Sequence, residues 1–354
     1  MSTSQSAAST LDRKRAPQPQ LGIVLVNWNR WTDTIECLES VFRSTIPIRV
    51  VVVDNDSQDG SLDRIAEWAA GQRVAAAANP QMAGLIQPPI RKPISTRRFR
   101  ASEMPGNSGV SDTQLSLVES GGNLGFAGGN NVGLRLLLSD RRLDYFWLLN
   151  NDTVIDPMAA ESLLLRMQAS PRIGMCGTVV RYYHRPDAVQ ALNGSRFNRW
   201  TGQSQNIGIG QSISAPFNPA DVVRETDFVL GASLAVTRPF LEKIGPMEER
   251  YFLYYEEIDW ATRSDEQFDI GFAHGAIVWH KEGGSIGSSG AAGARSAFSD
   301  YWLTRSRLRF TRLHHPPLLA WHWLLTLAIA GKRLLRRQPD KAWAIMRALF
   351  GVTY

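Results

Sequence analysis

Two short β-branched runs separated by a helix-like segment constrain the fold of this chain more than any other feature. LGIVLVN covers residues 21–27 and RVVVVD covers residues 49–54. Between positions 35 and 42, apolar residues recur with the spacing of a helix. Continuous apolar runs are typical of parallel strands that are buried on both faces of a sheet. The order strand, helix, strand therefore predicts a βαβ unit and an α/β fold.

The remaining elements are predicted from the same periodicities. We expect strands at residues 115–119, 145–149, 174–182 and 227–237, and helices at residues 61–70, 130–139, 159–169, 239–244 and 259–266. Residues 79–113 are rich in Pro, Gly, Ser and Arg and show no period, which indicates a flexible insertion. Residues 184–225 are polar and allow no assignment. The pattern predicts one domain at residues 21–299 and a basic, amphipathic helical tail at residues 300–354.

Composition limits the class of protein. Hydrophobic residues make up 44% and charged residues 20% of the 354 residues, as in folded soluble proteins. Residues 1–20 are polar and lack the apolar run of a signal peptide, so we expect a disordered lead-in. Cys37 and Cys176 lie in apolar stretches, without the spacing of a metal knuckle or a disulfide framework. A reducing, cytoplasmic location is therefore expected.

The net charge of +6 is concentrated at the C-terminus. From Asp300 to Tyr354, ten Lys and Arg stand against two Asp, a net of +8, so the preceding 299 residues carry −2. Nucleic-acid-binding proteins usually place basic residues on their working face, so a near-neutral main domain argues against a nucleic-acid partner. The basic tail indicates an anionic partner of its own.

Acidic residues follow two of the predicted strands. Asp54 ends the second β-branched run, and Asp152 follows the strand at residues 145–149. Either Asp alone could simply turn the chain or cap the next helix. However, the carboxyl edge of a parallel sheet is where such folds bind ligands. Between the two lies Gly121–Gly133, whose six glycines let backbone N–H groups approach a phosphate. This order favours a nucleotide site, although the loop is not the GxGxxG fingerprint of dinucleotide-binding proteins.

Six motifs, in this order, resemble the family-2 glycosyltransferases. They are VVVDNDSQDGS, NLGFAGGNNVGL, LLNNDT, FVLGASLAVTR, YFLYYEEIDWATR and VWHKEGGSIG, and the similarity covers about residues 21–290. The most similar subgroup is the rhamnosyltransferase-like enzymes of bacterial surface polysaccharides. The resemblance implies a GT-A fold, in which a Rossmann-like nucleotide half is joined to an acceptor-binding half.

The resemblance also implies a donor site. Asp54 would contact the nucleotide base, and Asn27, at the end of the first strand, is a further candidate for donor binding. The other donor-binding residues implied are Asn123, Gly125, Asn131, Asn150 and Asn151. The residues implied to line the phosphate are Gly283, Gly284 and Ser285.

A metal site is implied at the position of the DXD motif. Here the motif reads Asn150-Asn151-Asp152, so Asp152 is its one carboxylate, and the late His280 would be the second ligand of Mg²⁺ or Mn²⁺. A hard cation with oxygen ligands stabilises a departing diphosphate. A histidine after an apolar strand is by itself more often structural, so the ligand role depends on the order of the motifs.

Three carboxylates in four residues stand in YYEEIDW. A solvated helix start is the simpler interpretation, since the helix dipole favours acids there. However, crowded carboxylates beside aromatic rings have raised pKa values, as a general base requires. The resemblance places Glu257 at the catalytic position with Glu256 beside it, and the choice between the two stays open. The residues implied to shape the acceptor pocket are Gly231, Ala232, Asp259 and Arg263.

The tail predicts a contact with a membrane surface. Leu318–Gly331 is an apolar stretch of fourteen residues, shorter than the roughly 20 that span a bilayer. Arginines precede it, Lys and Arg follow it, and Trp321 and Trp323 suit a headgroup interface. The alternative is a helix docked on the main domain.

Together these features predict a metal-dependent, inverting glycosyltransferase at the inner face of the cell membrane. The donor would be a dTDP-, UDP- or GDP-linked sugar, with rhamnose as the candidate, and the acceptor a lipid-linked or polysaccharide glycan. A sugar nucleotidylyltransferase is one alternative, but it needs a Gly- and Arg-rich loop where this chain has NWNRW at residues 27–31. A non-catalytic glycan-binding protein is the other alternative, and the full set of acidic residues with His280 argues against it.

Overall fold

The fold is described by a computed structural model that covers residues 20–104, 113–282 and 295–354. The predicted lead-in falls outside these residues, except for Gln20. The main sheet holds β1 (Leu21–Asn27), β2 (Ile48–Asp54), β3 (Thr96–Arg100), β4 (Leu115–Glu119), β5 (Tyr145–Asn150), β6 (Thr153–Ile155), β7 (Ile173–Tyr182), β8 (Val189–Leu192), β12 (Ser233–Thr237) and β13 (Asp269–His280). The smaller sheet holds β9 (Gly194–Asn198), β10 (Gln203–Asn206) and β11 (Phe228–Val229). The α-helices are α1 (Trp31–Val41), α2 (Ser61–Ala70), α3 (Ala83–Ile86), α4 (Gly125–Leu138), α5 (Ala159–Gln168), α6 (Pro219–Glu225), α7 (Arg238–Ile244), α8 (Glu256–Ser264), α9 (Ala297–His314), α10 (Leu319–Leu335) and α11 (Pro339–Leu349).

The strand order of the main sheet confirms the predicted fold class. It runs β3-β4-β2-β1-β5-β12-β7-β13-β6, with β8 paired to β7. The five strands from β3 to β5 are parallel, and β12 is antiparallel to both of its neighbours. Because β7 is antiparallel to β12 and parallel to β13, strands β1, β5 and β13 all end at the same edge. A mixed, mainly parallel sheet is thus flanked by helices, as the βαβ pattern predicted.

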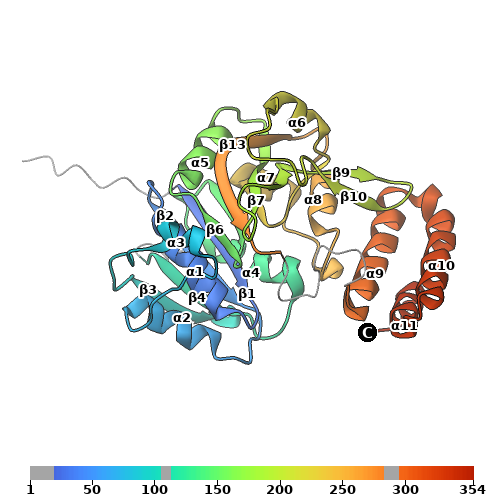
Figure 1. Cartoon of the computed structure of the whole chain (residues 1–354), viewed down its shortest axis with the longest axis horizontal. Helices are drawn as coiled ribbons and strands as arrows, with labels where there is room; N and C mark the ends of the chain where they lie inside the picture. Colours follow the sequence, from blue (N-terminus) through green and yellow to red (C-terminus); the bar gives the residue numbers. More distant parts are fainter. Residues whose placement is uncertain (1–19, 105–112, 283–294) are drawn as a thin grey trace, which may run out of the picture.

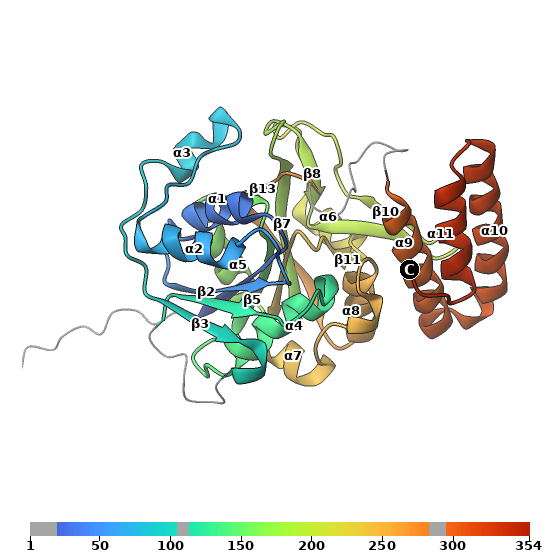
Figure 2. The same cartoon turned by 90° about the horizontal axis from the view of Figure 1, so that it is seen from below.

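Helices cover both faces of this sheet (Figures 1 and 2). Alternate residues of β1 divide between the faces, since side chains of a strand point to opposite sides. Leu21, Ile23 and Leu25 pack with apolar residues of α1, α2 and α5. Val24 packs with α4, α7 and α8 on the other face. Burial on both sides explains why the strand is an unbroken apolar run.

Three sequence predictions need correction. Within the predicted flexible insertion, residues 79–104 contain α3 and β3, which pairs with β4 as an edge strand, and residues 105–112 lie outside the described part. The strand predicted at 227–237 is two strands in different sheets, β11 and β12. Helix α8 begins at Glu256, three residues before the predicted start, so Glu256 and Glu257 are in its first turn.

The tail is a three-helix module beside the main domain (Figures 1 and 2). Helix α11 packs against α9 and α10, and α9 also contacts the main domain. Helix α10 joins the domain through two hydrogen bonds, Trp321 Nε1 to Trp200 O at 2.8 Å and His322 Nε2 to Arg199 O at 2.9 Å. Helix α9 thus docks on the main domain and begins at Ala297, three residues before the expected domain boundary. The apolar stretch Leu318–Gly331 lies mainly in α10, and its membrane contact stays a prediction.

Candidate active site

A cleft of about 560 Å³ opens at the edge where β1, β5 and β13 end. The polar part of its lining consists of Asn55, Asn123, Asn130, Asn150, Asn151, Asp152, Gln190, His280, Glu282 and Ser296. The apolar part consists of Val26, Trp28, Phe126, Leu149, Phe252, Leu253 and Phe298. A lining with both kinds of side chain suits a ligand that combines a charged group with a ring or hydrocarbon.

Asp152 and His280 meet in the polar part of the cleft. Asp152 follows β5, His280 ends β13, and the pairing of β13 with β6 places His280 opposite Thr153. The imidazole Nε2 lies 3.2 Å from Asp152 Oδ1. Burial opposes charge on both groups, but their mutual attraction outweighs it, so the pKa of Asp152 is lowered and the pKa of His280 is raised. The sheet register thus brings together two side chains that lie 128 positions apart in the sequence.

This pair fits a divalent cation. A carboxylate oxygen and an imidazole nitrogen are both ligands of Mn²⁺-type ions, and here they face the same point. The ring's other nitrogen, Nδ1, lies 3.0 Å from Gln190 Oε1, an arrangement common for metal-binding histidines. Among the described residues, no group of three or more His, Cys, Asp or Glu side chains could hold a metal. Of the described residues, Asp152 and His280 would therefore be the two ligands.

Asn27 and Asp54 lie beneath the cleft. Asn27 is fully buried, and its Nδ2 donates to Asp54 Oδ1 at 2.8 Å. Its Oδ1 accepts from Thr34 Oγ1 at 2.7 Å, and Thr34 in turn accepts from Asn151 Nδ2 at 2.9 Å. Of the two neighbours Asp54 and Asn55, Asn55 is the one that lines the cleft. Asn27 therefore holds Asp54 and Asn151 in place, and the predicted direct contact of Asn27 with a donor is corrected to support.

The glycine-rich loop reaches the cleft at the start of α4. Asn123 and Gly125 line it, as expected, and Asn55 Nδ2 donates to Gly125 O at 3.0 Å. Gly125 has a φ of +69°, and a Cβ there would overlap the carbonyl oxygen of Phe252. Phe126 N donates to that same oxygen at 2.8 Å. Glycine is therefore required where the loop crosses the segment that carries Phe252.

Asn131 does not reach the cleft. Its side chain is buried and forms two hydrogen bonds with the main chain of Met247. It donates to Met247 O at 2.9 Å and accepts from Met247 N at 3.1 Å. A further bond joins it to Glu249 at 3.0 Å. The predicted donor contact is thus replaced by a structural one, which ties α4 to the segment leading to Tyr251.

The two candidate bases sit in the first turn of α8. Glu256 is 2% exposed, and its Oε2 has no hydrogen-bond partner among the described residues. Burial and the neighbouring charge of Glu257 hold the pKa of Glu256 well above its ordinary range. Burial raises the pKa of Glu257 to about 7. Neither carboxylate is among the side chains that line the 560 Å³ cleft. Both resist ionisation, because the pKa of each is raised.

Gly231 and Ala232 connect Glu257 to the end of β5, the strand that precedes Asp152. A Cβ at Gly231 would overlap the Glu257 carboxylate, so only glycine leaves room for that side chain. The next residue, Ala232, accepts a hydrogen bond from Asn150 N at 3.0 Å. Both residues are buried, and neither lines the cleft. They link Glu257 to the end of β5, and their predicted acceptor role stays a prediction.

The segment that precedes α8 has an unusual backbone. Phe252, Tyr254 and Tyr255 have φ values of +60°, +67° and +73°. Such conformations cost about 1–3 kcal/mol each and persist only where the surroundings hold them. Helix α9 provides that hold: Ser306 Oγ donates to Leu253 O at 2.9 Å and Tyr251 O at 3.2 Å. In addition, Trp302 stacks on Phe252 with ring centroids 4.5 Å apart.

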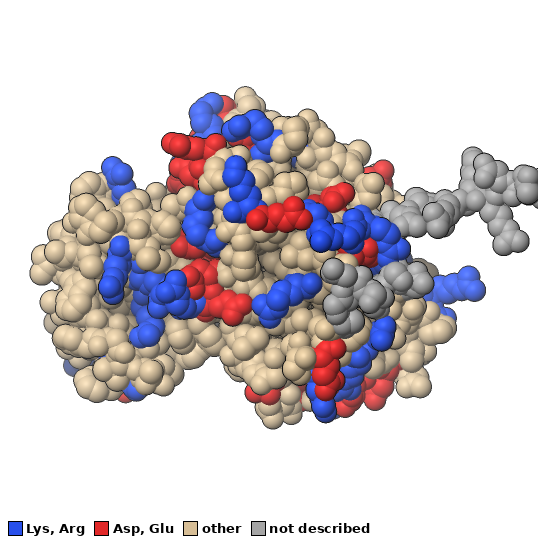
Figure 3. All heavy atoms as spheres, turned by 180° about the vertical axis from the view of Figure 1, so that it is seen from behind, with Lys and Arg blue, Asp and Glu red and all other residues tan. Residues whose placement is uncertain are grey.

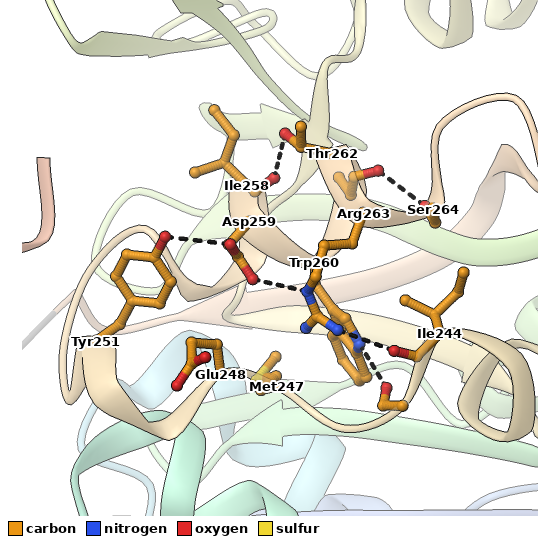
Figure 4. Close-up of polar contacts among 12 residues, drawn as sticks. Ile244, Met247, Glu248, Tyr251, Ile258, Asp259, Trp260, Thr262, Arg263 and Ser264 are labelled. Carbon is orange, nitrogen blue, oxygen red and sulfur yellow. Dashed lines mark hydrogen bonds and ion pairs between the residues drawn. The ribbon is translucent and has the colours of Figure 1, made fainter. Parts of the chain in front are cut away.

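Asp259 and Arg263 are used for bracing. Arg263 Nε donates to Asp259 Oδ2 at 2.8 Å, and its two terminal nitrogens donate to Ile244 O and Pro246 O (Figure 4). Tyr251 OH donates to Asp259 Oδ1 at 3.1 Å (Figure 4), which also lies 2.8 Å from His314 Nε2 of α9. Burial would raise the pKa of Asp259, but His314 and Arg263 lower it. Both side chains therefore belong to a network that fixes α8, and their predicted acceptor role stays a prediction.

Some site residues were not predicted, and three predicted ones cannot be placed. Gly283, Gly284 and Ser285 lie outside the described residues. Gln190, on β8, and Glu282, after β13, line the cleft. Gln190 was not predicted, because β8 falls in a polar stretch that gave no periodic signal. Ser296, just before α9, and Phe298, on α9, also line the cleft. No motif or periodicity marks these two residues, because only the packing of α9 brings them to the cleft.

Comparison with known proteins supports a sugar-transfer class. Residues 22–87 match the family described as Glycosyl transferase family 2. The low-salt glycan biosynthesis hexosyltransferase Agl10 of Haloferax volcanii is 26% identical over 169 residues, which is 46% of this chain and 50% of that protein. The chain thus spans about half the length of the curated relative it matches.

Solved structures resemble the chain more distantly. The mannosyltransferase PcManGT from Pyrobaculum calidifontis, in complex with GDP-Man and Mn²⁺, has a TM-score of 0.48 at 14% identity, covering 96% of this chain and 77% of that one. S. aureus TarS residues 1–349, in complex with UDP, have a TM-score of 0.44 at 10% identity, covering 95% and 93%.

Proposed function

We propose that this protein is a metal-dependent, inverting glycosyltransferase that uses a nucleoside-diphosphate sugar. The observation that carries the proposal is the Asp152–His280 pair, set at a strand edge in a cleft whose wall includes Asn150 and Asn151. The family match over residues 22–87 supports the same class of reaction.

In this proposal Asp152 and His280 hold the cation, with Nε2 of the imidazole and a carboxylate oxygen as ligands. A divalent cation bound there would neutralise the charge that builds up on the leaving diphosphate. Asn123 and the start of α4 line the same cleft as the cation site, and the positive end of a helix dipole favours an anion there. The uracil, thymine or guanine ring would lie toward β1 and Trp28.

Glu257 is the proposed general base. It would take the proton of the acceptor hydroxyl as that oxygen attacks the anomeric carbon from the face opposite the diphosphate. A base with a pKa near 7 is half deprotonated at working pH and still accepts a proton readily. Glu257 packs against Gly231, and the next residue, Ala232, accepts a hydrogen bond from Asn150 N, so the base lies close to the strand end that carries the cation site. The Glu257 side chain is partly exposed.

The proposed sugar is rhamnose, carried on dTDP, with UDP- and GDP-sugars as the alternatives. The test is a thermal-shift panel of dTDP, UDP and GDP with and without Mn²⁺, since a ligand that binds the folded state raises the Tm. One nucleotide should stand out, and only with the metal present. Equal shifts for all three, unchanged by Mn²⁺, would contradict the proposal.

The acceptor is proposed to be a lipid-linked glycan at the inner face of the cell membrane, where the tail would bind anionic lipid. Support comes from helix α10, where large apolar side chains are exposed and small or polar ones are buried. Its buried side chains are His322, Thr326 and Ala330, whereas Trp323, Leu324 and Leu327 are exposed. In Figure 3 the module, on the left, is largely uncharged surface interrupted by basic side chains. An apolar face bordered by Lys and Arg is what an anionic bilayer surface binds.

Pro316–Leu335 is long and apolar enough to cross a membrane by length and composition, with 17% of it buried. We propose that it lies on the surface instead, because spanning would break the bonds of His322 to Arg199 O and of Arg307 to Thr326. Full-length protein should sediment with vesicles containing anionic lipid and be released by alkaline carbonate. A Leu324→Glu, Leu327→Glu variant should not sediment, whereas the control Leu165→Glu, an exposed leucine of α5, should. Retention after carbonate extraction would contradict surface binding.

A further inference from the structure

We propose that Gln190 is a positioning residue that selects the tautomer of His280, so that Nε2 presents a bare lone pair to the cation. This inference rests on the proposed metal site. Gln190 lies on β8, outside the motifs that carry the family resemblance, and is 5% exposed within the cleft wall.

The orientation of the Gln190 amide is fixed from its far side. Its Nε2 donates to Glu282 Oε1 at 3.1 Å, and an ionised carboxylate can only accept. The amide oxygen must therefore point the other way, and it lies 3.0 Å from His280 Nδ1. The main chain of Gln190 is held as well, since Asn206 Nδ2 donates to its carbonyl oxygen at 3.2 Å.

The tautomer follows from this orientation. An amide oxygen only accepts, so Nδ1 must carry the hydrogen, and a neutral ring then has no hydrogen on Nε2. Two groups face Nε2: Asn150 Nδ2, a donor at 3.3 Å, and Asp152 Oδ1, which accepts from Nε2 when the ring is protonated at both nitrogens. In the neutral ring, the hydrogen that Gln190 holds on Nδ1 leaves Nε2 with its lone pair. The opposite tautomer would point an N–H at Asp152 Oδ1, 3.2 Å away, and remove both ligand atoms from the cation site.

The test uses Gln190→Leu, which keeps the approximate volume and removes the acceptor. Two properties are measured on the full chain. The first is the affinity for Mn²⁺ alone, from the EPR signal of free Mn²⁺. The second is the His280 tautomer in metal-free protein, from ¹⁵N NMR with histidine labelling at a pH at which the ring is neutral. Loss of such an outer partner typically weakens metal binding about 10–100-fold. We expect that loss, together with a new population of the Nε2–H tautomer. Gln203→Leu, an exposed residue of β10, is the matched control and should change neither.

An exchange of the two partners provides a rescue. In the double variant Gln190→Glu, Glu282→Gln, the carboxylate at 190 accepts from Nδ1–H and the amide at 282 donates to that carboxylate. Mn²⁺ affinity and the Nδ1–H tautomer should both return, which a loss of packing could not explain. His280→Ala separates the two claims. If it weakens Mn²⁺ binding while Gln190→Leu changes neither affinity nor tautomer, Gln190 has no positioning role. If His280→Ala leaves Mn²⁺ affinity unchanged, the metal site is wrong, and the NMR signal still reports whether Gln190 sets the tautomer.

Discussion

The metal edge, formed by Asp152 and His280, and the carboxylate segment, residues 252–257, are built in different ways. Asp152 and His280 stand at the ends of strands, and the sheet register alone brings them within 3.2 Å. Residues 252–257, in contrast, adopt positive φ values at three positions and are held by α9 on one side and the glycine-rich loop on the other. The first region is rigid by its architecture, and the second depends on contacts with distant parts of the chain. Changes far from the cleft should therefore affect the base and spare the cation.

The largest effect is expected at the metal edge. Asp152→Asn keeps the shape and removes the charged ligand, so sugar transfer should be abolished and nucleoside-diphosphate binding should no longer depend on Mn²⁺. Activity with and without EDTA and calorimetric titration measure the two effects. Asp156→Asn, in the loop after β6, is the control and should retain both. Full activity of the wild-type protein in EDTA would show that the pair is structural.

A smaller loss is expected at the base. Glu257→Gln should lower kcat by about 10²–10⁴-fold with little change in donor affinity, because general-base catalysis contributes on that scale. The wild-type rate should rise with pH through about 7, where Glu257 loses its proton. Glu256→Gln is the matched comparison, and a greater loss there would assign the base to Glu256. If both variants turn over normally, the base lies elsewhere.

Helix α9 gives the sharpest contrast between the two regions. Ser306→Ala removes the hydroxyl that holds Tyr251 O and Leu253 O, so the carboxylate segment should loosen. A displacement of about 1 Å can cost up to 10²-fold in rate, and we expect kcat to fall within that limit. Mn²⁺ affinity should stay unchanged, because no contact of Ser306 reaches the metal edge. Equal losses in kcat and in metal affinity would erase the distinction between the two regions.

The smallest effect concerns stability. Folding raises the pKa of Glu256 above its unfolded value, so its protonated form is favoured in the folded state. That contribution is complete below the unfolded pKa of about 4.3 and is lost as pH rises through the folded pKa. Glu256→Gln should therefore raise the free energy of unfolding at pH 8 by on the order of 1 kcal/mol, seen as a higher Tm, and have little effect at pH 4. A variant less stable than the wild type at pH 8 would contradict the assigned environment.

The sequence predicted what local pattern determines. The strands at 21–27 and 115–119 and the helix at 61–70 have the expected bounds, and Asp152 and His280 lie together as the motif order implied. Nothing in YYEEIDWATR reveals that Asp259 bonds Tyr251 and that Arg263 bonds two main-chain carbonyls, so this network could not be predicted. Phe298 was missed for a related reason, since its place in the cleft depends on how α9 packs. Positions set by strand register could be predicted, and positions set by packing between distant segments could not.

The anomeric configuration of the product tests the central claim most directly. If Asp152 and His280 hold the cation while Glu257 activates the acceptor, one displacement occurs at the anomeric carbon and its configuration must invert. The coupling of the anomeric proton, read by NMR as the product forms from a nucleoside-diphosphate sugar and an acceptor with Mn²⁺ present, distinguishes the outcomes. We predict the inverted configuration. A product that retains the donor's configuration would contradict the account.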